Sequence, residues 1–344
     1  MIANALEWIA GFLLALVTLR DVFDTVVVPG GARGLRVSLR LVFLALPIAK
    51  RLSRSGVGLN FAPAALLSSF VVWMLLLILA FALMTHALRS WFSPALQGFG
   101  DALYLAASAL ATIGVGNSQA YGPASAVAAT AGFCGLGVMT MAVTYLLEVQ
   151  TNIGVRDAGV LKISTSSGHP PTAIALLERY AALGCRDELE HILRNGRDWC
   201  AAVLQSHASH PSLIYFRSAG VGSGWPATLG ALMDLALVIE LVLDDPRHFG
   251  LAVLAREQAE RLARELTSLL RLPPDTTETT APEVEDLCRR LVAAGYSLQR
   301  GLDVQAFIAA RGRRLACIEA LANHVGTGNT RLLPSADPEP AGRK

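Results

Sequence analysis

The chain has 344 residues, of which 53% are hydrophobic and 16% are charged, and its formal net charge is +2. The apolar fraction is too high for an ordinary soluble domain, and the nearly balanced charge argues against a nucleic-acid partner. Five cysteines, an odd number without CxxC spacing, exclude a secreted disulfide scaffold. Cys185 and Cys200 with the histidines His191, His207 and His210 fit no zinc spacing, so we expect reduced thiols and no bound metal.

Three apolar runs are long enough to cross a bilayer, whose hydrocarbon core of roughly 30 Å needs about 20 residues. They are residues 2–19, 61–88 and 122–149. The first run lacks the basic start and the cleavage pattern of a signal peptide, so we interpret it as a retained helix. Acids and bases become dense only after about residue 156, which predicts a membrane part joined to a water-soluble part.

The segment 25–60 sets the expected orientation. It holds no carboxylate but several basic side chains, namely Arg33, Arg36, Arg40, Lys50, Arg51 and Arg54. The positive-inside rule places this segment in the cytoplasm. The second run then crosses outward and the third returns, which predicts a multi-pass protein of the inner (plasma) membrane with a cytoplasmic C-terminal half. Residues 35–50 are interpreted either as a helix on the bilayer surface or as a plain anchoring loop.

Between the last two runs, the sequence predicts a short helix over 102–111 with Asp101 as its N-cap. This helix is uncharged and too short to span, so it enters a membrane only when packed within protein. The sequence TIGVG follows at 112–116. Alternate glycines let successive carbonyls turn to one side and replace the hydration shell of a cation, which the negative end of a helix also favours. The other GVG triplets, at Gly56 and Gly220, lack this setting.

The order of span, short helix, TIGVG and span resembles the two-span pore module of potassium channels, whose signature is TVGYG or TIGYG. The resemblance covers residues 61–150, and RDVFDTVVVP at 20–29 is similar to the opening of bacterial members with an extra leading helix. It implies an ion-binding filter of five residues, with the Thr112 hydroxyl and the carbonyls of Thr112 to Val115 as ligands of permeant K⁺: Thr112, Ile113, Gly114, Val115 and Gly116. A single strand cannot surround an ion, so the geometry and the resemblance both predict a homotetramer in a lipid bilayer.

Two residues depart from the pattern of the family. Val115 replaces the usual aromatic side chain, and Asn117 replaces the usual aspartate after the filter. The first change removes a ring that helps to hold the filter, and the second removes a charge from the outer mouth. The sequence therefore favours potassium but leaves a non-selective cation channel as the alternative.

The last span carries a glycine cluster, Gly132, Gly135 and Gly137, which fits either a gating hinge or close helix packing. One helical face of this span is predicted to line the pore or form its gate: Gly137, Met141, Thr144 and Glu148. Glu148 is interpreted either as a ring of charge at the cytoplasmic mouth or as a carboxylate that merely reaches the interface.

The second half shows helical periodicity over 172–183, 186–206, 227–243, 249–270, 282–300 and 302–325. Asp234 and Glu240 would be costly in lipid, so 227–243 is predicted to be a buried helix of an all-α domain. SAGVGSGWP at 218–226 has the wrong glycine spacing for a nucleotide-binding loop. The tail 327–344 is predicted to be disordered.

The prediction is an all-α membrane pore module with an N-terminal helix and an all-helical cytoplasmic domain. Its segments are 1–60, 61–150, 151–326 and 327–344. We expect a tetrameric cation channel without cofactors other than permeant K⁺, and no enzyme, because no nucleophile with a partnered base is evident. A membrane-anchored receptor or scaffold with a vestigial pore segment is the alternative from another class.

The cytoplasmic half is expected to assemble the tetramer or to couple a stimulus to the gate. An unknown regulatory ligand is compatible with two groups of residues. The histidines His191, His207, His210 and His248 would sense pH, and an anion would bind the basic group Arg289, Arg290, Arg311, Arg313 and Arg314. Both groups are equally compatible with solvated helix faces.

Overall fold

The computed structural model describes residues 2–28, 61–167, 170–216, 218, 224–276, 278–327 and 330–334. Their regular secondary structure is helical apart from one two-stranded sheet and an isolated bridge, so the predicted all-α fold is confirmed. The chain divides into a membrane unit, residues 1–48 and 60–149, and a C-terminal unit, residues 49–59 and 150–344. The predicted surface helix at 35–50, the triplets at Gly56 and Gly220, and the tail from residue 335 lie outside the described residues.

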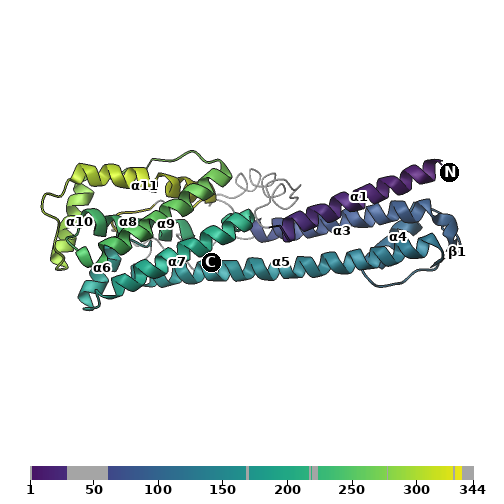
Figure 1. The fold of residues 1–344 in the computed structure, drawn as a ribbon, viewed down its shortest axis with the longest axis horizontal. Coiled ribbons are helices and arrows are strands. Elements are labelled where there is room, and N and C mark those ends of the chain that lie inside the picture. Colours follow the sequence, from purple (N-terminus) through teal and green to yellow (C-terminus); the bar gives the residue numbers. More distant parts are fainter. Residues whose placement is uncertain are drawn as a thin grey trace. The chain divides into compact units, whose positions relative to one another are not determined.

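Helices α1 (Ile2–Val26) and α3 (Phe61–Ala87) lie side by side in the membrane unit (Figure 1). A side chain at Gly11 would come within 2.5 Å of the Ala80 carbonyl oxygen, so glycine permits this close approach. The buried indole of Trp73 donates a 2.8 Å hydrogen bond from Nε1 to Oδ2 of Asp21. Helix α1 thus continues beyond the predicted end at residue 19, and one carboxyl oxygen of Asp21 accepts a hydrogen bond inside the unit.

A second polar pair joins the same two helices at their other ends. Nδ1 of His86 lies 2.7 Å from Oε1 of Glu7, and the His86 ring makes an edge contact with Phe99 at a centroid distance of 5.7 Å. The pairing explains how Glu7 is accommodated in the apolar N-terminal part of α1.

Helix α4 (Phe99–Leu110) is short and packs against α3. Strand β1 (Phe92–Ser93) precedes it and pairs antiparallel with β2 (Gln119–Ala120), with Phe92 opposite Ala120. This small sheet brings the segment before α4 next to the segment after the TIGVG loop. Helix α4 and the TIGVG loop therefore form one connection between α3 and α5, and the sheet joins the two ends of this connection.

Helix α5 (Pro123–Ser167) is much longer than the predicted span 122–149. Its first part is apolar and its second part carries charged residues such as Arg156 and Lys162. Composition therefore marks where the apolar stretch ends, but it does not mark where the helix ends. Together with α1 and α3, α5 is long and apolar enough to cross a bilayer, and these helices indicate a membrane protein.

The C-terminal unit is built from further helices whose predicted ranges differ by a few residues at most ends. They are α6 (Ala173–Ala182), α7 (Glu188–Ser209), α8 (Gly224–Leu241), α9 (Pro246–Leu270), α10 (Ala281–Ala293) and α11 (Val304–Val325), with a 3-10 turn η2 (Pro211–Tyr215) after α7. The prediction for α10 was wrong at its C-terminal end, because Gly295 turns the chain with φ +81°.

Helix α8 is the centre of the C-terminal unit and packs against α9 and α11. It is apolar and long enough to resemble a membrane span, but it is buried along nearly its whole length. Its Asp234 accepts two 2.8 Å hydrogen bonds from the Arg311 guanidinium of α11, and both side chains are buried. As predicted, α8 is a core helix of an all-α domain.

Candidate functional site

The TIGVG loop is held by its backbone amides to the C-terminal end of α4. The Thr112 amide donates to the Ala109 carbonyl at 3.0 Å, and the amides of Ile113 and Gly114 donate to the Ser108 carbonyl at 3.0 and 3.4 Å. Four successive loop amides are thus satisfied by α4, because the next one, from Val115, donates to Oγ of Ser108 at 2.8 Å.

The loop carbonyls are distributed differently. Among the described residues, no hydrogen-bond donor reaches the carbonyls of Thr112, Ile113 or Gly114, and these residues are exposed. The Val115 carbonyl is engaged, because Oγ of Ser108 lies 2.8 Å away and donates to it. Three of the four predicted carbonyl ligands are thus available to a ligand from outside the chain, and the fourth is already bonded to α4.

Two loop residues adopt the left-handed conformation, Thr112 with φ 56° and Gly114 with φ 70°. A side chain at Gly114 would meet open space, so the dihedral angle alone requires glycine there. At Gly116 the requirement is different, because an added Cβ would lie 2.3 Å from Cδ2 of Leu105. The two glycines of TIGVG are therefore needed for conformation and for packing, respectively.

The start of the short helix was predicted wrongly. Helix α4 begins at Phe99, with Gly98 as its N-cap, and Asp101 lies in its first turn. The Asp101 carboxylate reaches back and accepts a 3.0 Å hydrogen bond from the Gln97 amide. The contact resembles half of a capping box, except that the amide bonded is one residue before the N-cap.

The glycines of the α5 cluster differ in how closely they approach α4. An added Cβ at Gly135 would lie 1.9 Å from the Leu110 carbonyl oxygen, and one at Gly132 would lie 3.5 Å from that of Ala109. The backbone of α5 therefore touches the end of α4 that carries the loop. Gly137 meets nothing within 4 Å. Close packing thus explains Gly135, whereas Gly137 has no packing partner among the described residues.

The predicted pore-lining face lies on the surface of the single chain. Met141, Thr144 and Glu148 are exposed, and Gly137 is half-buried. Oγ1 of Thr144 donates a 3.0 Å hydrogen bond to the Thr140 carbonyl one turn earlier, as side chains of this type do in apolar surroundings.

The arginines considered as an anion site have carboxylate partners instead. Arg311 pairs with Asp234, Arg290 with Glu178 at 2.6 Å, and Arg289 with Asp286 at 2.7 Å; Arg314 contacts Glu260. Arg313 is exposed. The structure does not bring the five side chains together around one site, so the charges serve mainly to join helices of the C-terminal unit.

The histidine and cysteine candidates are mostly structural as well. His207 is buried, and burial lowers the pKa of its imidazole to about 3, with a further contribution from the positive charge of Arg156. His248 lies 2.7 Å from Asp245 in the first turn of α9. Burial raises the pKa of the Cys200 thiol. Across the described ranges, no three metal-binding side chains cluster.

Sequence reasoning missed Ser108 as a member of the site. It is the buried side chain that binds both the amide and the carbonyl of Val115. The signal was present, because a serine interrupts an apolar helix one turn before the loop. A hydroxyl that both donates and accepts suits a position that must hold a peptide unit in place.

Comparison of the chain with protein-family models, with curated proteins and with solved structures found no match.

Proposed function

We propose that four copies of this chain form a potassium-selective cation channel in the inner (plasma) membrane, with residues 112–116 as its filter. One observation carries the proposal: the loop amides bind α4, while the carbonyls of Thr112, Ile113 and Gly114 accept no hydrogen bond from the described residues. Carbonyl oxygens in rings replace the hydration shell of an alkali cation. One chain supplies one such loop, so several copies must share an axis, and the resemblance to the two-span family sets the number at four.

Electrostatics and placement support the same assignment. The loop follows the C-terminal end of α4, where the helix dipole is negative and attracts cations. The flanking helices α3 and α5 are apolar enough to span a bilayer, and the basic segment 25–60 favours a cytoplasmic C-terminal unit. In this arrangement the Gly137, Met141, Thr144 and Glu148 face of α5 lines the pore below the filter, and the C-terminal unit serves assembly or gating.

Potassium flux into liposomes containing the purified chain tests the proposal. Gly114→Ala should abolish the flux, because alanine strains the backbone at φ 70° and disturbs the carbonyls. Gly250→Ala is the matched control, since its Cβ also meets open space but lies in α9 of the C-terminal unit. Absence of flux in the wild type, or equal flux in both variants, would favour a receptor or scaffold whose pore segment is vestigial.

Selectivity needs a separate measurement, because Val115, Asn117 and the engaged Val115 carbonyl all favour the second candidate, a non-selective cation channel. Reversal potentials in asymmetric potassium and sodium separate the two. A potential near the potassium equilibrium value supports the leading proposal, and equal permeabilities would replace it with the non-selective channel.

The role of Glu148 is tested by conductance. If four of these carboxylates ring the inner mouth, Glu148→Gln should lower single-channel conductance at low ionic strength and have little effect at high salt. An unchanged conductance at low salt would show that Glu148 lies at the interface rather than in the pore.

A further inference from the structure

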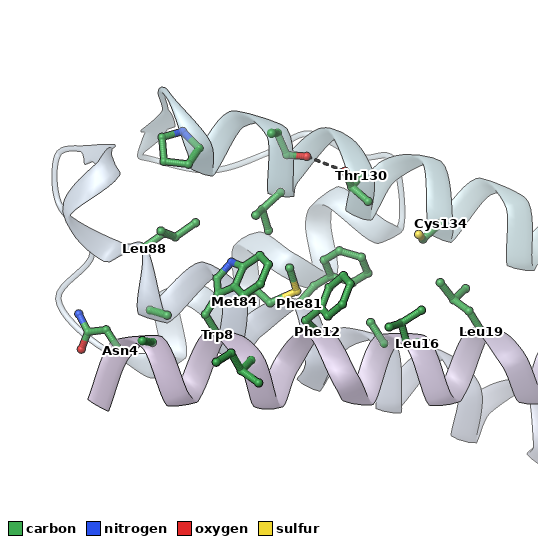
Figure 2. Close-up of a pocket in the computed structure, with 17 residues that line it drawn as sticks. Asn4, Trp8, Phe12, Leu16, Leu19, Phe81, Met84, Leu88, Thr130 and Cys134 are labelled. Carbon is green, nitrogen blue, oxygen red and sulfur yellow. Dashed lines mark hydrogen bonds between the residues drawn. The ribbon is translucent and has the colours of Figure 1, made fainter. Parts of the chain in front are cut away.

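The membrane unit contains an elongated crevice of about 790 Å³ that the proposed ion pathway does not use. Helices α1 and α5 form its two sides, and side chains of α3, including Phe81 and Met84, line it between them (Figure 2). Asn4 and Leu88 lie at one end of the crevice, and Leu19 and Cys134 lie toward the other.

The walls of the crevice are apolar. Trp8 and Phe12 stack with a centroid distance of 5.4 Å and an interplanar angle of 7°, which presents a flat aromatic surface along α1. The hydroxyl of Thr130 is satisfied within α5, because it donates to the Ala126 carbonyl at 2.8 Å. A polar ligand would therefore find few partners along the walls, and the crevice suits an apolar occupant.

The dimensions of the crevice favour a long, thin occupant. On α1 the lining runs from Asn4 to Leu19, about 22 Å at the rise of an α-helix, and on α5 from Pro123 to Cys134, about 16 Å. One leaflet of a bilayer is about 15 Å deep, half of the hydrocarbon core. The lining is thus long enough to follow an acyl chain through one leaflet.

Charge complementarity identifies the polar end of that occupant. Leu88 lines the crevice, and the next residue, Arg89, is exposed and forms no ion pair within the described part of the chain. Nearby, the rings of Trp91 and Tyr121 contact each other at 5.6 Å, and the Tyr121 hydroxyl donates to the Ser90 carbonyl. Clustered aromatic residues with an unpaired cation are typical of the headgroup level of a membrane.

We propose that this crevice binds one acyl chain of a phospholipid whose phosphate lies at Arg89. The acyl chain packs between Trp8 and Phe12 of α1 and the Ala126 and Thr130 side of α5. Its terminal methyl end reaches Cys134, which precedes Gly135 at the contact with α4. The inference concerns lipid binding alone and stands whether or not the chain conducts ions.

Photolabelling tests the site directly. The full chain is reconstituted in phosphatidylcholine vesicles that contain a phospholipid with a diazirine in its acyl chain, and adducts are mapped by mass spectrometry after irradiation. We expect adducts on crevice-lining residues of the wild type and their loss in Ala126→Phe, which fills the crevice. Ala129→Phe is the matched control, because Ala129 is exposed on the same helix and does not line the crevice.

Equal adducts in the wild type and both variants would mean non-specific annular lipid and would overturn the proposal. A photoreactive amino acid in place of Phe12 tests whether a second copy of the chain, and not lipid, fills the crevice. Adducts with lipid support the site, whereas adducts with a second copy of the chain would show that a neighbouring subunit fills it. If Ala126→Phe does not fold, Thr130→Met replaces it as the filling variant.

The headgroup contact is tested by native mass spectrometry of the detergent-purified chain. Arg89→Gln should lose the retained phospholipid, and Arg89→Lys should keep it, because a positive charge is what the phosphate requires. Unchanged lipid retention in Arg89→Gln would remove the phosphate from the proposal.

Discussion

The membrane unit and the C-terminal unit place their polar and apolar groups in opposite ways. In the membrane unit, large side chains such as Phe133 and Leu147 are exposed, while the Trp73 and Asp21 pair lies inside. In the C-terminal unit, α8 is buried along nearly all of its length and charged side chains join the outer helices. The difference indicates that the membrane unit is stable in lipid and the C-terminal unit in water, because exposed apolar surface is stable only against lipid or protein.

The buried pair of Asp234 and Arg311 is an exception in the C-terminal unit, because these two charged side chains lie in its core. Arg311→Met should destabilise it by about 3–5 kcal/mol, because an unpaired buried carboxylate remains. Urea unfolding of the full chain, followed by tryptophan fluorescence, measures the loss. The double variant Asp234→Leu with Arg311→Met should recover most of it.

Arg289→Met is the control for that experiment. Its side chain is exposed beside the half-buried Asp286, so the expected change is about 0.5 kcal/mol or less. Similar losses for both single variants would show that the buried pair has no special role.

The membrane unit depends on contact between α5 and the end of α4. Gly135→Ala should cost about 1–3 kcal/mol, because its Cβ would overlap the Leu110 carbonyl. Gly137→Ala meets open space and should be neutral or stabilise the helix by up to about 1 kcal/mol. Thermal unfolding in detergent compares the two. If Gly135→Ala were as stable as Gly137→Ala, the close packing would be wrong.

The C-terminal unit should also respond to acid, through His207. Its folded pKa of about 3 lies below the ordinary value of 6.5, so the unfolded chain binds the proton more tightly. Stability is then lost as the pH falls from about 6.5 toward about 3, by about 2 kcal/mol between pH 7 and pH 5.

Replacing the imidazole checks this assignment. In His207→Phe the decrease in the free energy of unfolding between pH 7 and pH 5, measured by urea unfolding, should be smaller by about 2 kcal/mol. An unchanged pH dependence would assign the effect to other groups.

A further comparison is between two buried indoles. Trp73 donates to Asp21 in the membrane unit, and Trp199 donates to the Arg156 carbonyl at 3.0 Å in the C-terminal unit. Beyond the shared loss of ring volume, removing the hydrogen bond should cost about 1–3 kcal/mol in Trp73→Phe, because a buried carboxyl oxygen of Asp21 loses its donor. The cost should be about 1 kcal/mol in Trp199→Phe, because the acceptor there is a backbone carbonyl within α5. Unfolding in detergent and in urea measures each. A smaller loss for Trp73→Phe than for Trp199→Phe would contradict this order.

Much of the fold could be predicted, because hydropathy and periodicity are local properties of the chain. The spans at 61–88 and 122–149, the core helix at 227–243 and the loop after the short helix all follow from composition and spacing. The ends of α1, α4 and α10 were less predictable, because each depends on a partner or a turn that composition does not report.

The sequence alone determined which segments are apolar enough for a membrane, where a glycine-punctuated loop follows a short uncharged helix, and that Asp234 belongs in a protein core. Only the tertiary structure decided that Ser108 fixes Val115, that Gly135 touches Leu110, that the arginines pair with carboxylates, and that α1 and α5 leave a crevice between them. The physical reason is that the preference of a side chain for water or lipid is a local property, which each residue carries by itself. Tertiary contacts join residues far apart in the chain, and the sequence does not show which distant residues will meet.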